Sequence, residues 1–485
     1  MTIRRRATTL LTAALLVSSF AGASGARAAN ARSGAGFAVR MVKLAGDPGD
    51  PGTVAHVKFC RELGFNALWV YGHEAGVWTK ERAPKGPLLD PNFLRLARWC
   101  RRHGMDLWVS INPVADTGER FVFSDPDGER RLLAFAAMLR KQAGVRRIVL
   151  SFDDQPTELR ELSDVFRYGL SAAPAHLDLA RRMASGLPKD VAPWLCAAAY
   201  CDTHLGDGTG AYGKAFLAGL PALSPDVGIV WTGPKVLSPT ITREDLEATR
   251  ARLGGRRLLL YDNVLVKDHD EANALGLVLA PLRGRAPGIR EVVAAYLSCP
   301  LLPLAGSRLT LLTSADFLRS PSDYDPETSA ARAIKHLAGA GRPATTALET
   351  QQLEWGRPID GGRDAVRDVT TADLAAHRLF DPAFVDSFTW TAERYPGRMA
   401  ALAQLTDIPF RDDLLRMMRH RLAIARAMPL TIDYLARVRA GRADAVSVLA
   451  RIDDERRALD GDPDARRVLE IFLGAATIPP SERMR

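Results

Sequence analysis

Short apolar runs alternate with amphipathic, helix-like segments from residue 37 to residue 297. The amphipathic segments lie at 53–63, 92–103, 129–142, 174–186, 243–253 and 271–283. The apolar runs, which favour strands, lie at 37–43, 66–71, 106–112, 147–152, 192–198, 228–232, 257–262 and 290–297. Eight strands, each followed by a helix or a loop, are the number that a (β/α)8 barrel needs. A doubly wound sheet is the alternative, but no glycine-rich phosphate loop follows the first strand. We therefore expect an α/β fold with a TIM-type barrel over residues 37–330.

The pattern changes after residue 330, where helical periodicity continues and strand signals are few. Residues 341–371 are rich in Gly, Pro and Thr and are predicted to be a linker. Helices are expected at 327–340, 372–377, 382–393, 396–405, 411–427, 429–439, 442–458 and 463–473. The sequence therefore predicts a linker and an antiparallel α-helical bundle over residues 331–485.

The N-terminus has the pattern of a secretory signal peptide. Three arginines, Arg4 to Arg6, precede an apolar stretch from Ala7 to about Phe20, and small residues lead to an A-x-A site ending at Ala28. We expect residues 1–28 to be removed and the protein to be exported to the periplasm or the medium by the Sec or twin-arginine route. No later stretch is long and apolar enough to span a bilayer, so no membrane span is expected in the mature chain.

Composition excludes some classes of function. The formal charge of +9 is spread over 485 residues without alternating basic and aromatic positions, which argues against nucleic-acid binding. No His, Cys and carboxylate cluster has metal-ligand spacing, so no metal is expected. The five cysteines form no CxxC pattern; Cys60 and Cys100 are predicted to be core thiols, and one disulfide among the five stays possible on sequence alone.

The stretch with the strongest chemical signal is Arg147–Pro156, in which a predicted strand ends in Asp153 and Asp154. Successive strand residues point to opposite faces, so both carboxylates can serve one site only where the strand breaks into a loop. The alternative is structural, because Asp-Asp before Pro156 and Thr157 is also a common way to cap a helix. Neighbouring carboxylates raise one another's pKa, which suits a reaction with one charged partner and one proton donor.

Polar and aromatic residues also follow the predicted strands on either side of this pair, where a barrel places its active site. Aromatic faces and hydrogen-bonding groups together suit a sugar ligand. Glycosidases that use two direct carboxylates normally place them on different strands, flanking the bond. Adjacent carboxylates fit a substrate-assisted reaction better, in which the sugar's 2-acetamido group is the nucleophile. These strand-end residues are Asn112, Tyr200, Asp202, Trp231, Thr232, Asp262 and Asn263.

Five short motifs, in order along the chain, resemble those of glycoside hydrolase family 84, the β-N-acetylglucosaminidases that include the O-GlcNAc hydrolases. Trp231–Val236 resembles the family's Trp-Thr-Gly-Pro closely, and Ile148–Gln155 resembles its Asp-Asp motif. The other three are Ile111-Asn112-Pro113, Cys196–Tyr200 and Tyr261-Asp262-Asn263 with the following Asp268. The resemblance covers about residues 100–335, and a helical bundle after the barrel also fits bacterial members.

The resemblance implies a role for each matched residue. Asp153 would orient and polarise the acetamido N–H, Asp154 would be the general acid and then the base, and Tyr200 would hydrogen-bond the acetamido carbonyl. Trp231 would wall the N-acetyl pocket and Asn263 would bind sugar hydroxyls. The remaining substrate-binding candidates are Asp268 and Asn112. No cofactor is implied, because the substrate supplies the nucleophile, and the implied partner is a glycoconjugate carrying a 2-acetamido sugar.

Several positions depart from the family pattern. The first strand, residues 40–46, keeps only the glycine of the family's Gly-Phe-Tyr-Gly, and Glu74 stands where a lysine contacts the sugar. Arg319 stands near the place of a pocket tryptophan, and Ser238 near that of a sugar-binding acid. Two further hypotheses therefore stay open: a carbohydrate-binding protein on a degenerate barrel with little turnover, and a glycosidase for another 2-acetamido sugar. The natural glycan, exo or endo action, and the oligomeric state are not predicted.

Overall fold

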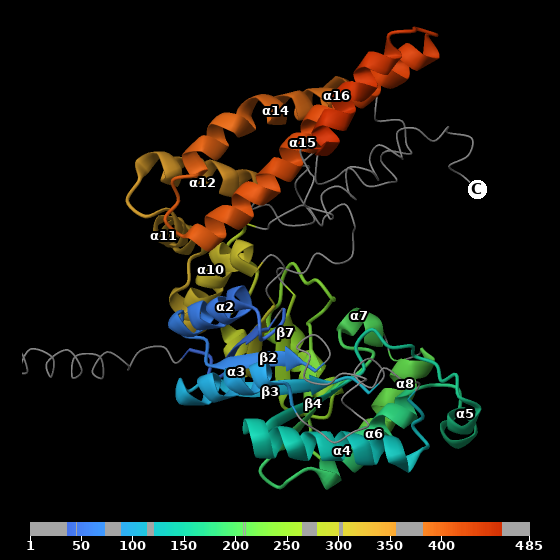
Figure 1. Ribbon diagram of the computed structural model, residues 1–485. Coiled ribbons are helices and arrows are strands. Elements are labelled where there is room, and N and C mark those ends of the chain that lie inside the picture. Colours follow the sequence, from blue (N-terminus) through green and yellow to red (C-terminus); the bar gives the residue numbers. More distant parts are fainter. Residues whose placement is uncertain are drawn as a thin grey trace, which may run out of the picture.

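The computed structural model describes residues 36–44, 46–72, 89–113, 121–206, 208, 210–263, 279–299, 304–355 and 382–457. A closed barrel of parallel strands in the order β1 to β8 occupies the N-terminal part of the chain, and a bundle of long helices follows it (Figure 1). The predicted (β/α)8 fold is confirmed. The strands are β1 (Arg40–Lys43), β2 (Ala67–Tyr71), β3 (Asp106–Ile111), β4 (Arg147–Ser151), β5 (Ala192–Cys196), β6 (Gly228–Trp231), β7 (Leu258–Asp262) and β8 (Val293–Ser298).

Alternation along each strand divides the core into two layers. On β4, Val149 belongs to the cluster inside the barrel, whereas Ile148 and Leu150 belong to the larger cluster that also contains buried residues of the surrounding helices. The interior is filled by bulky aromatic side chains, including the tilted pair of Trp108 and Trp194 at 5.0 Å between ring centroids. The barrel is therefore a packed core, and a ligand can bind only at one of its ends.

The first three barrel helices each begin with an Asp-Pro dipeptide. Asp50, Asp90 and Asp125 accept hydrogen bonds from backbone N–H groups of the first turn, and the following proline fits the N1 position. The helices that cover the barrel are α2 (Pro51–Glu62), α3 (Pro91–Arg102), α4 (Pro126–Met138), α6 (Ala173–Gly186), α8 (Ala211–Gly219), α9 (Arg243–Arg252) and α10 (Arg308–Arg319).

Shorter elements fill the connections. The π-helical turn η1 (Leu139–Ala143) extends α4, and α5 (Leu162–Tyr168) and α7 (Asp202–Leu205) follow β4 and β5. Four 3-10 turns complete the described connections: η2 (Leu220–Ala222), η4 (Pro287–Glu291), η5 (Leu304–Ser307) and η6 (Pro321–Asp323). The helix expected at 271–283 is not formed at residues 279–283, and its remainder lies outside the described residues.

The C-terminal part is helical as expected, but its breaks fall elsewhere. Residues 342–355, predicted to be part of a linker, form α12, whose Ala344 and Leu348 lie in the core of the bundle. Pro396 and Pro429 stand inside α14 and α15, where separate helices were expected, because packing along each helix outweighs the hydrogen bond that a proline removes. The bundle helices are α11 (Pro326–Ala338), α12 (Arg342–Trp355), α14 (Pro382–Leu402), α15 (Ile408–Arg439) and α16 (Ala445–Arg457).

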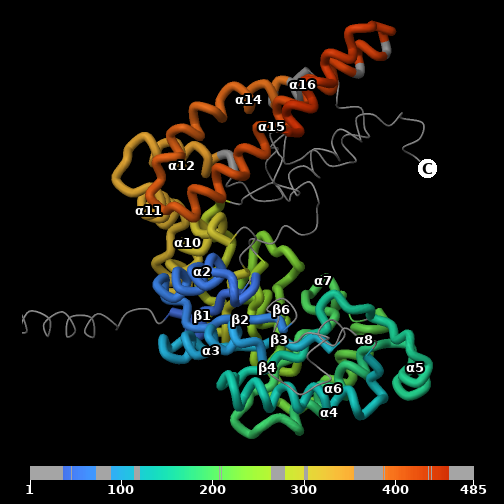
Figure 2. The backbone as a smooth tube through the Cα atoms, viewed as in Figure 1, coloured from blue at the N-terminus to red at the C-terminus, as the bar shows by residue number. Residues whose placement is uncertain are grey.

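Helix α10 joins the two parts of the molecule (Figure 2). Its Leu309 packs in the bundle core, and Arg308 forms a nearly buried ion pair with Asp407, which also caps α15 by accepting from the Phe410 N–H at 3.0 Å. The backbone N–H of Gly306 donates to Asp413 at 3.0 Å. Because the last barrel helix contributes to the second core, the bundle is packed directly against the barrel.

Two further expectations concern membranes and thiols. The predicted signal peptide, residues 1–28, lies outside the described residues. Among the described helices, none is both long and apolar enough to cross a bilayer. All five cysteines are buried and unbridged, and Cys60 and Cys100 are core thiols on α2 and α3 as predicted.

Candidate active site

Asp153 and Asp154 follow β4 at the C-terminal end of the barrel. Asp153 is in phase with Val149 and Ser151, so it points toward the barrel axis. Strict alternation would turn Asp154 away. Instead, Asp154 has a φ of 57°, the only positive φ among the described non-glycine residues. This left-handed backbone costs on the order of 1 kcal/mol and ends the strand, which frees Asp154 from the outer layer.

Each carboxylate accepts a hydrogen bond from a different tyrosine. Tyr71, the last residue of β2, donates to Asp153 Oδ2 at 3.0 Å, and Ser151 donates to Oδ1 of the same carboxylate. Tyr200, after β5, donates to Asp154 Oδ1 at 2.8 Å. The next helix, α5, begins only at Leu162, with Glu161 as its N-cap residue, so the pair does not cap it. The helix-cap alternative is therefore wrong, and the pair belongs to the barrel end.

Tyr200 is held in place by the loops that follow β5 and β6. Its carbonyl accepts from the Thr232 N–H at 2.9 Å, and the Asp202 N–H donates to the Gly233 carbonyl at 3.1 Å. Gly233 has a φ of 104°, and an added Cβ would lie 3.1 Å from Ser238 Oγ, which explains the glycine in this turn. Burial, followed by the hydrogen bond and charge of Asp154, raises the pKa of Tyr200. Its hydroxyl group therefore stays protonated at neutral pH and available as a donor.

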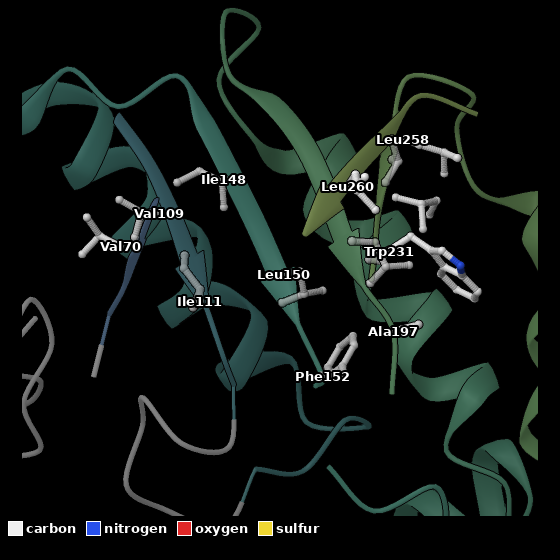
Figure 3. Packing of buried hydrophobic residues seen from close by; sticks show 14 of the residues in the cluster. Val70, Val109, Ile111, Ile148, Leu150, Phe152, Ala197, Trp231, Leu258 and Leu260 are labelled. Carbon is white, nitrogen blue, oxygen red and sulfur yellow. The ribbon is translucent and has the colours of Figure 1, made fainter. Parts of the chain in front are cut away.

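Trp231 does not join this group. It belongs to the cluster between the barrel and the helices, is 0% exposed, and lies in the layer that also contains Leu258 and Leu260 (Figure 3). The intervening Val230 is the β6 residue that faces the barrel interior. The predicted role of Trp231 as a wall of the N-acetyl pocket is therefore corrected: its position on the strand gives the indole a packing role.

The other predicted residues are placed as follows. Asn112 is 4% exposed, directly after β3. Asn263, directly after β7, donates from Nδ2 to the Val236 carbonyl at 3.1 Å, which ties it to the loop after β6. Asp202 accepts from Thr249 Oγ1 at 3.0 Å and so anchors α9. Asp268 and Glu74 lie outside the described residues.

Two departures from the family pattern concern residues away from the carboxylates. Arg319 ends α10 and donates from Nη2 to the Leu63 carbonyl at 3.3 Å, at the turn that precedes β2. That turn is at the N-terminal end of the barrel, so Arg319 cannot contact a sugar held by Asp153 and Asp154. Ser238 is buried and bonds the backbone of Lys235, which makes it a turn residue.

Three residues at this end of the barrel carried no predicted role: Tyr71, Ser151 and Tyr261. Tyr71 and Tyr261 are each 8% exposed and belong to the interior cluster, and Ser151 contacts Asp153. The alternation of side chains along a strand would have predicted their direction, because each lies two positions after a residue that faces the barrel interior. Those interior residues are Trp69, Val149 and Leu259. A phenol or hydroxyl at the last inward position of a barrel strand is well placed to contact a ligand or its catalytic groups.

The arrangement combines two carboxylates with neutral phenol donors at one barrel end. In the described residues, no group of three or more His, Cys, Asp or Glu side chains gathers as a metal site. Asp153 is half-buried between two donors, whereas Asp154 is exposed, so the described residues do not supply the apolar surroundings expected for a general acid. A pair of carboxylates at the C-terminal end of a (β/α)8 barrel is the arrangement of barrel glycoside hydrolases.

Comparison with known proteins assigns the family. The profile of the β-N-acetylglucosaminidase family matches residues 89–352, more than half of the chain. The chain belongs to this family, glycoside hydrolase family 84, as a divergent member. It is 25% identical over 229 residues to the Protein O-GlcNAcase of Rattus norvegicus and to that of Mus musculus, which is 47% of this chain and 24% of each relative. The match thus spans about a quarter of the length of these relatives.

Solved structures share the fold over most of the chain. A Thermobaculum terrenum O-GlcNAc hydrolase with an Asp-to-Asn substitution superposes with a TM-score of 0.62 at 19% identity, covering 91% of this chain and 94% of its own. The structure of CpGH84B gives a TM-score of 0.60 at 17% identity, with coverage of 91% and 77%. The similarity therefore includes helices beyond the barrel.

Proposed function

We propose that this protein is an exported, retaining glycoside hydrolase that removes β-linked N-acetylglucosamine, or a related 2-acetamido sugar, from a glycoconjugate. The observation that carries the proposal is the pair Asp153–Asp154, with Tyr71 on one carboxylate and Tyr200 on the other. Adjacent residues cannot attack one face of a sugar while protonating the other, so a nucleophile from the substrate fits them best. Family membership supports the same class of substrate.

The roles follow from the hydrogen bonds. Asp153 accepts the acetamido N–H, which increases the nucleophilicity of the acetamido oxygen. That oxygen attacks C1, the bond from C1 to the glycosidic oxygen breaks, and Asp154 gives its proton to the leaving oxygen. The product is an oxazoline, cationic at nitrogen when protonated and neutral if Asp153 accepts that proton. Water then attacks C1, and Asp154 takes the water's proton. The bond from C1 to the oxazoline oxygen breaks while Asp153 returns to the nitrogen any proton it accepted, so the acetamide is restored and the configuration is retained.

Tyr200 would exchange partners during this cycle. In the structure its hydroxyl donates to Asp154 at 2.8 Å. When a substrate is bound, the same proton can reach the acetamido carbonyl and hold it beneath C1. Asp154 acts as the proton donor at that point, once the Tyr200 hydroxyl has turned from its carboxylate to the substrate. Asn112, Asn263 and Asp268 are proposed as sugar-binding residues.

A panel of aryl glycosides tests the proposal. The panel varies the 2-substituent (acetamido or hydroxyl) and the configuration at C4, and the measurement is kcat/KM for each member. We expect hydrolysis of the β-2-acetamido glucoside and no detectable hydrolysis of the 2-hydroxyl analogue, because the latter lacks the nucleophile. A preference for the C4 epimer would indicate another 2-acetamido sugar.

The same panel tests the alternative of a carbohydrate-binding protein. In that case no member would be hydrolysed, while N-acetylglucosamine thiazoline, a mimic of the oxazoline, would still bind in calorimetry. Equal hydrolysis of 2-acetamido and 2-hydroxyl substrates would contradict the substrate-assisted reaction outright.

A further inference from the structure

The hydroxyl group of Tyr71 links two distant strands inside the barrel. Tyr71 ends β2, and its hydroxyl lies 3.0 Å from Oδ2 of Asp153 after β4. The ring is nearly buried and packs edge-on against Trp69, at 5.7 Å between centroids. Because this packing fixes the orientation of the ring, it also directs the hydroxyl group toward Asp153.

The proton of this bond belongs to Tyr71. Burial, followed by the charge of Asp153, raises the pKa of Tyr71 well above its usual value, so the phenol is neutral and donates. Tyr261 in turn hydrogen-bonds Tyr71 and lies 3.6 Å from Cys299 Sγ. The Tyr71 phenol is therefore a neutral donor to the Asp153 carboxylate.

A cation lies over the same ring. Lys43, the last residue of β1, places Nζ 4.9 Å from the centroid of the Tyr71 ring. A cation on the face of a phenol ring attracts its electrons and makes the hydroxyl a stronger donor. Contacts therefore run across three strands: Lys43 on β1 lies over the ring of Tyr71 on β2, and Tyr71 donates to Asp153 after β4.

We propose that Tyr71 is a positioning residue, strengthened by Lys43, which holds the Asp153 carboxylate turned toward the acetamido N–H. The proposal rests on the proposed function. Tyr71 and Ser151 each occupy a different oxygen of Asp153, so the carboxylate cannot rotate without losing a donor. Each oxygen keeps a second lone pair for the substrate.

Among the described residues near Asp153, the Cys196 thiol and the Tyr261 phenol stay protonated near neutral pH. Burial raises the pKa of Cys196 and Tyr261 well above their usual values, and the charge of Asp153 acts in the same direction. His204 packs edge-on against Tyr200, at 4.7 Å between centroids. In the part of the chain that the structure describes, the titratable or charged groups that face Asp153 directly or through these partners are Lys43 on β1, Tyr71 on β2, Asp154 after β4, Cys196, Tyr200 and His204 on and after β5, and Tyr261 on β7.

The test compares pH profiles of kcat/KM for the full chain, Tyr71→Phe and Lys43→Met. Loss of the hydroxyl that donates to the Asp153 carboxylate should move the acidic limb of the Tyr71→Phe profile upward by about one pH unit. Lys43→Met should move it in the same direction by less. Binding of N-acetylglucosamine thiazoline should weaken about tenfold in Tyr71→Phe. The profiles are repeated in a His204→Gln background, so that the imidazole cannot cause the shift.

Tyr168→Phe is the matched control, because Tyr168 also donates a phenol hydrogen bond to a carboxylate, Asp178 Oδ2 at 2.9 Å, but between surface helices. Its profile should equal that of the unmodified chain. An unmoved acidic limb in a folded, active Tyr71→Phe protein would overturn the inference, as would a loss equal at every pH. A chain that binds thiazoline without turnover would contradict the proposed function alone, and the thiazoline pH dependence would then decide the role of Tyr71. Absence of both binding and turnover would overturn both.

Discussion

Asp154 combines a strained backbone with an exposed carboxylate, and both features follow from its place at the break of β4. An exposed, hydrogen-bonded carboxylate has little effect on the free energy of folding. The strained backbone is therefore the main destabilising effect of placing Asp154 beside Asp153. Because strained non-glycine backbone persists only where the surroundings impose it, Asp154 is the residue at which local stability and chemistry oppose one another.

Replacement of Asp154 by Asn should separate substrates by their leaving groups. The variant cannot donate a proton, so hydrolysis of 2-acetamido glycosides with poor leaving groups should fall about 10²–10⁴-fold. Substrates with very acidic phenols need little protonation and should lose much less. The measurement is kcat/KM over a series of aryl leaving groups. An equal loss for both classes would show that Asp154 is not the acid.

The functional role of a residue can be predicted from the sequence only where its side chain belongs to a recognisable chemical motif. Asp153, Asp154 and Tyr200 stand out in the sequence, and the structure brings them together. Trp231 and Arg319 were misplaced because a motif does not show which face of a strand or which end of a helix a side chain occupies. Tyr71 was overlooked because its partner, Asp153, is 82 positions away.

The loops after β6 and β7 are held together by one buried ion pair. Arg285 donates to both oxygens of Asp262, at 2.8 and 2.6 Å, and both side chains are at most 4% exposed. Arg285 also donates to the Pro239 carbonyl at 3.0 Å. Gly284 allows this approach, since an added Cβ would lie 2.1 Å from that carbonyl oxygen. The ion pair holds Asp262 in place, and with it the neighbouring residues Tyr261 and Asn263.

Asp262→Ala should therefore be strongly destabilising. It leaves the Arg285 guanidinium buried without its counter-charge, which should lower the free energy of unfolding by about 3–5 kcal/mol in urea titration. The double variant Asp262→Leu with Arg285→Met should recover much of this loss. The exposed pair Arg283–Glu327 is the control: Glu327→Gln should cost under about 1 kcal/mol. A similar loss in the free energy of unfolding for Asp262→Ala and Glu327→Gln would contradict the claim that burial makes the first ion pair important.

Element existence was far easier to predict than element ends. All eight strands were expected within a few residues, because a buried parallel strand is a continuous apolar run. The helix expected at 271–283 is absent in its described part, and α12 replaced a predicted linker. In both segments the local composition favours one secondary structure and tertiary packing favours another, and the packing determines which is formed.

Two buried histidines couple the stability of the whole molecule to pH. Burial, with the charge of Arg308 as a smaller cause, lowers the pKa of His56 to about 3, and burial alone lowers that of His176 to about 3. His176 stacks on Phe152, at 3.8 Å between centroids, just before the carboxylate pair. Both rings are neutral in the folded chain at any pH above about 3.

Acid should therefore weaken the fold from about pH 6.5 downward. Between pH 6.5 and 3 the unfolded chain binds these protons and the folded chain does not, so each histidine lowers the free energy of unfolding by about 1.4 kcal/mol per pH unit. Above pH 6.5 neither contributes a slope. Urea titrations from pH 7 to 5 should show a smaller slope in His56→Gln and in His176→Gln. Slopes equal to that of the unmodified chain in both variants would refute the account.

The central claim is that the substrate's own acetamido group is the nucleophile, held by Asp153 and assisted by Asp154. The most direct measurement is kcat/KM for one aryl 2-acetamido glucoside and its mono-, di- and trifluoroacetamido analogues. Fluorine withdraws electrons from the carbonyl oxygen, so the account predicts a steep fall along the series, by several powers of ten at the trifluoro member. A rate that is independent of fluorination would contradict it, because an enzyme nucleophile would not sense the acetamido group.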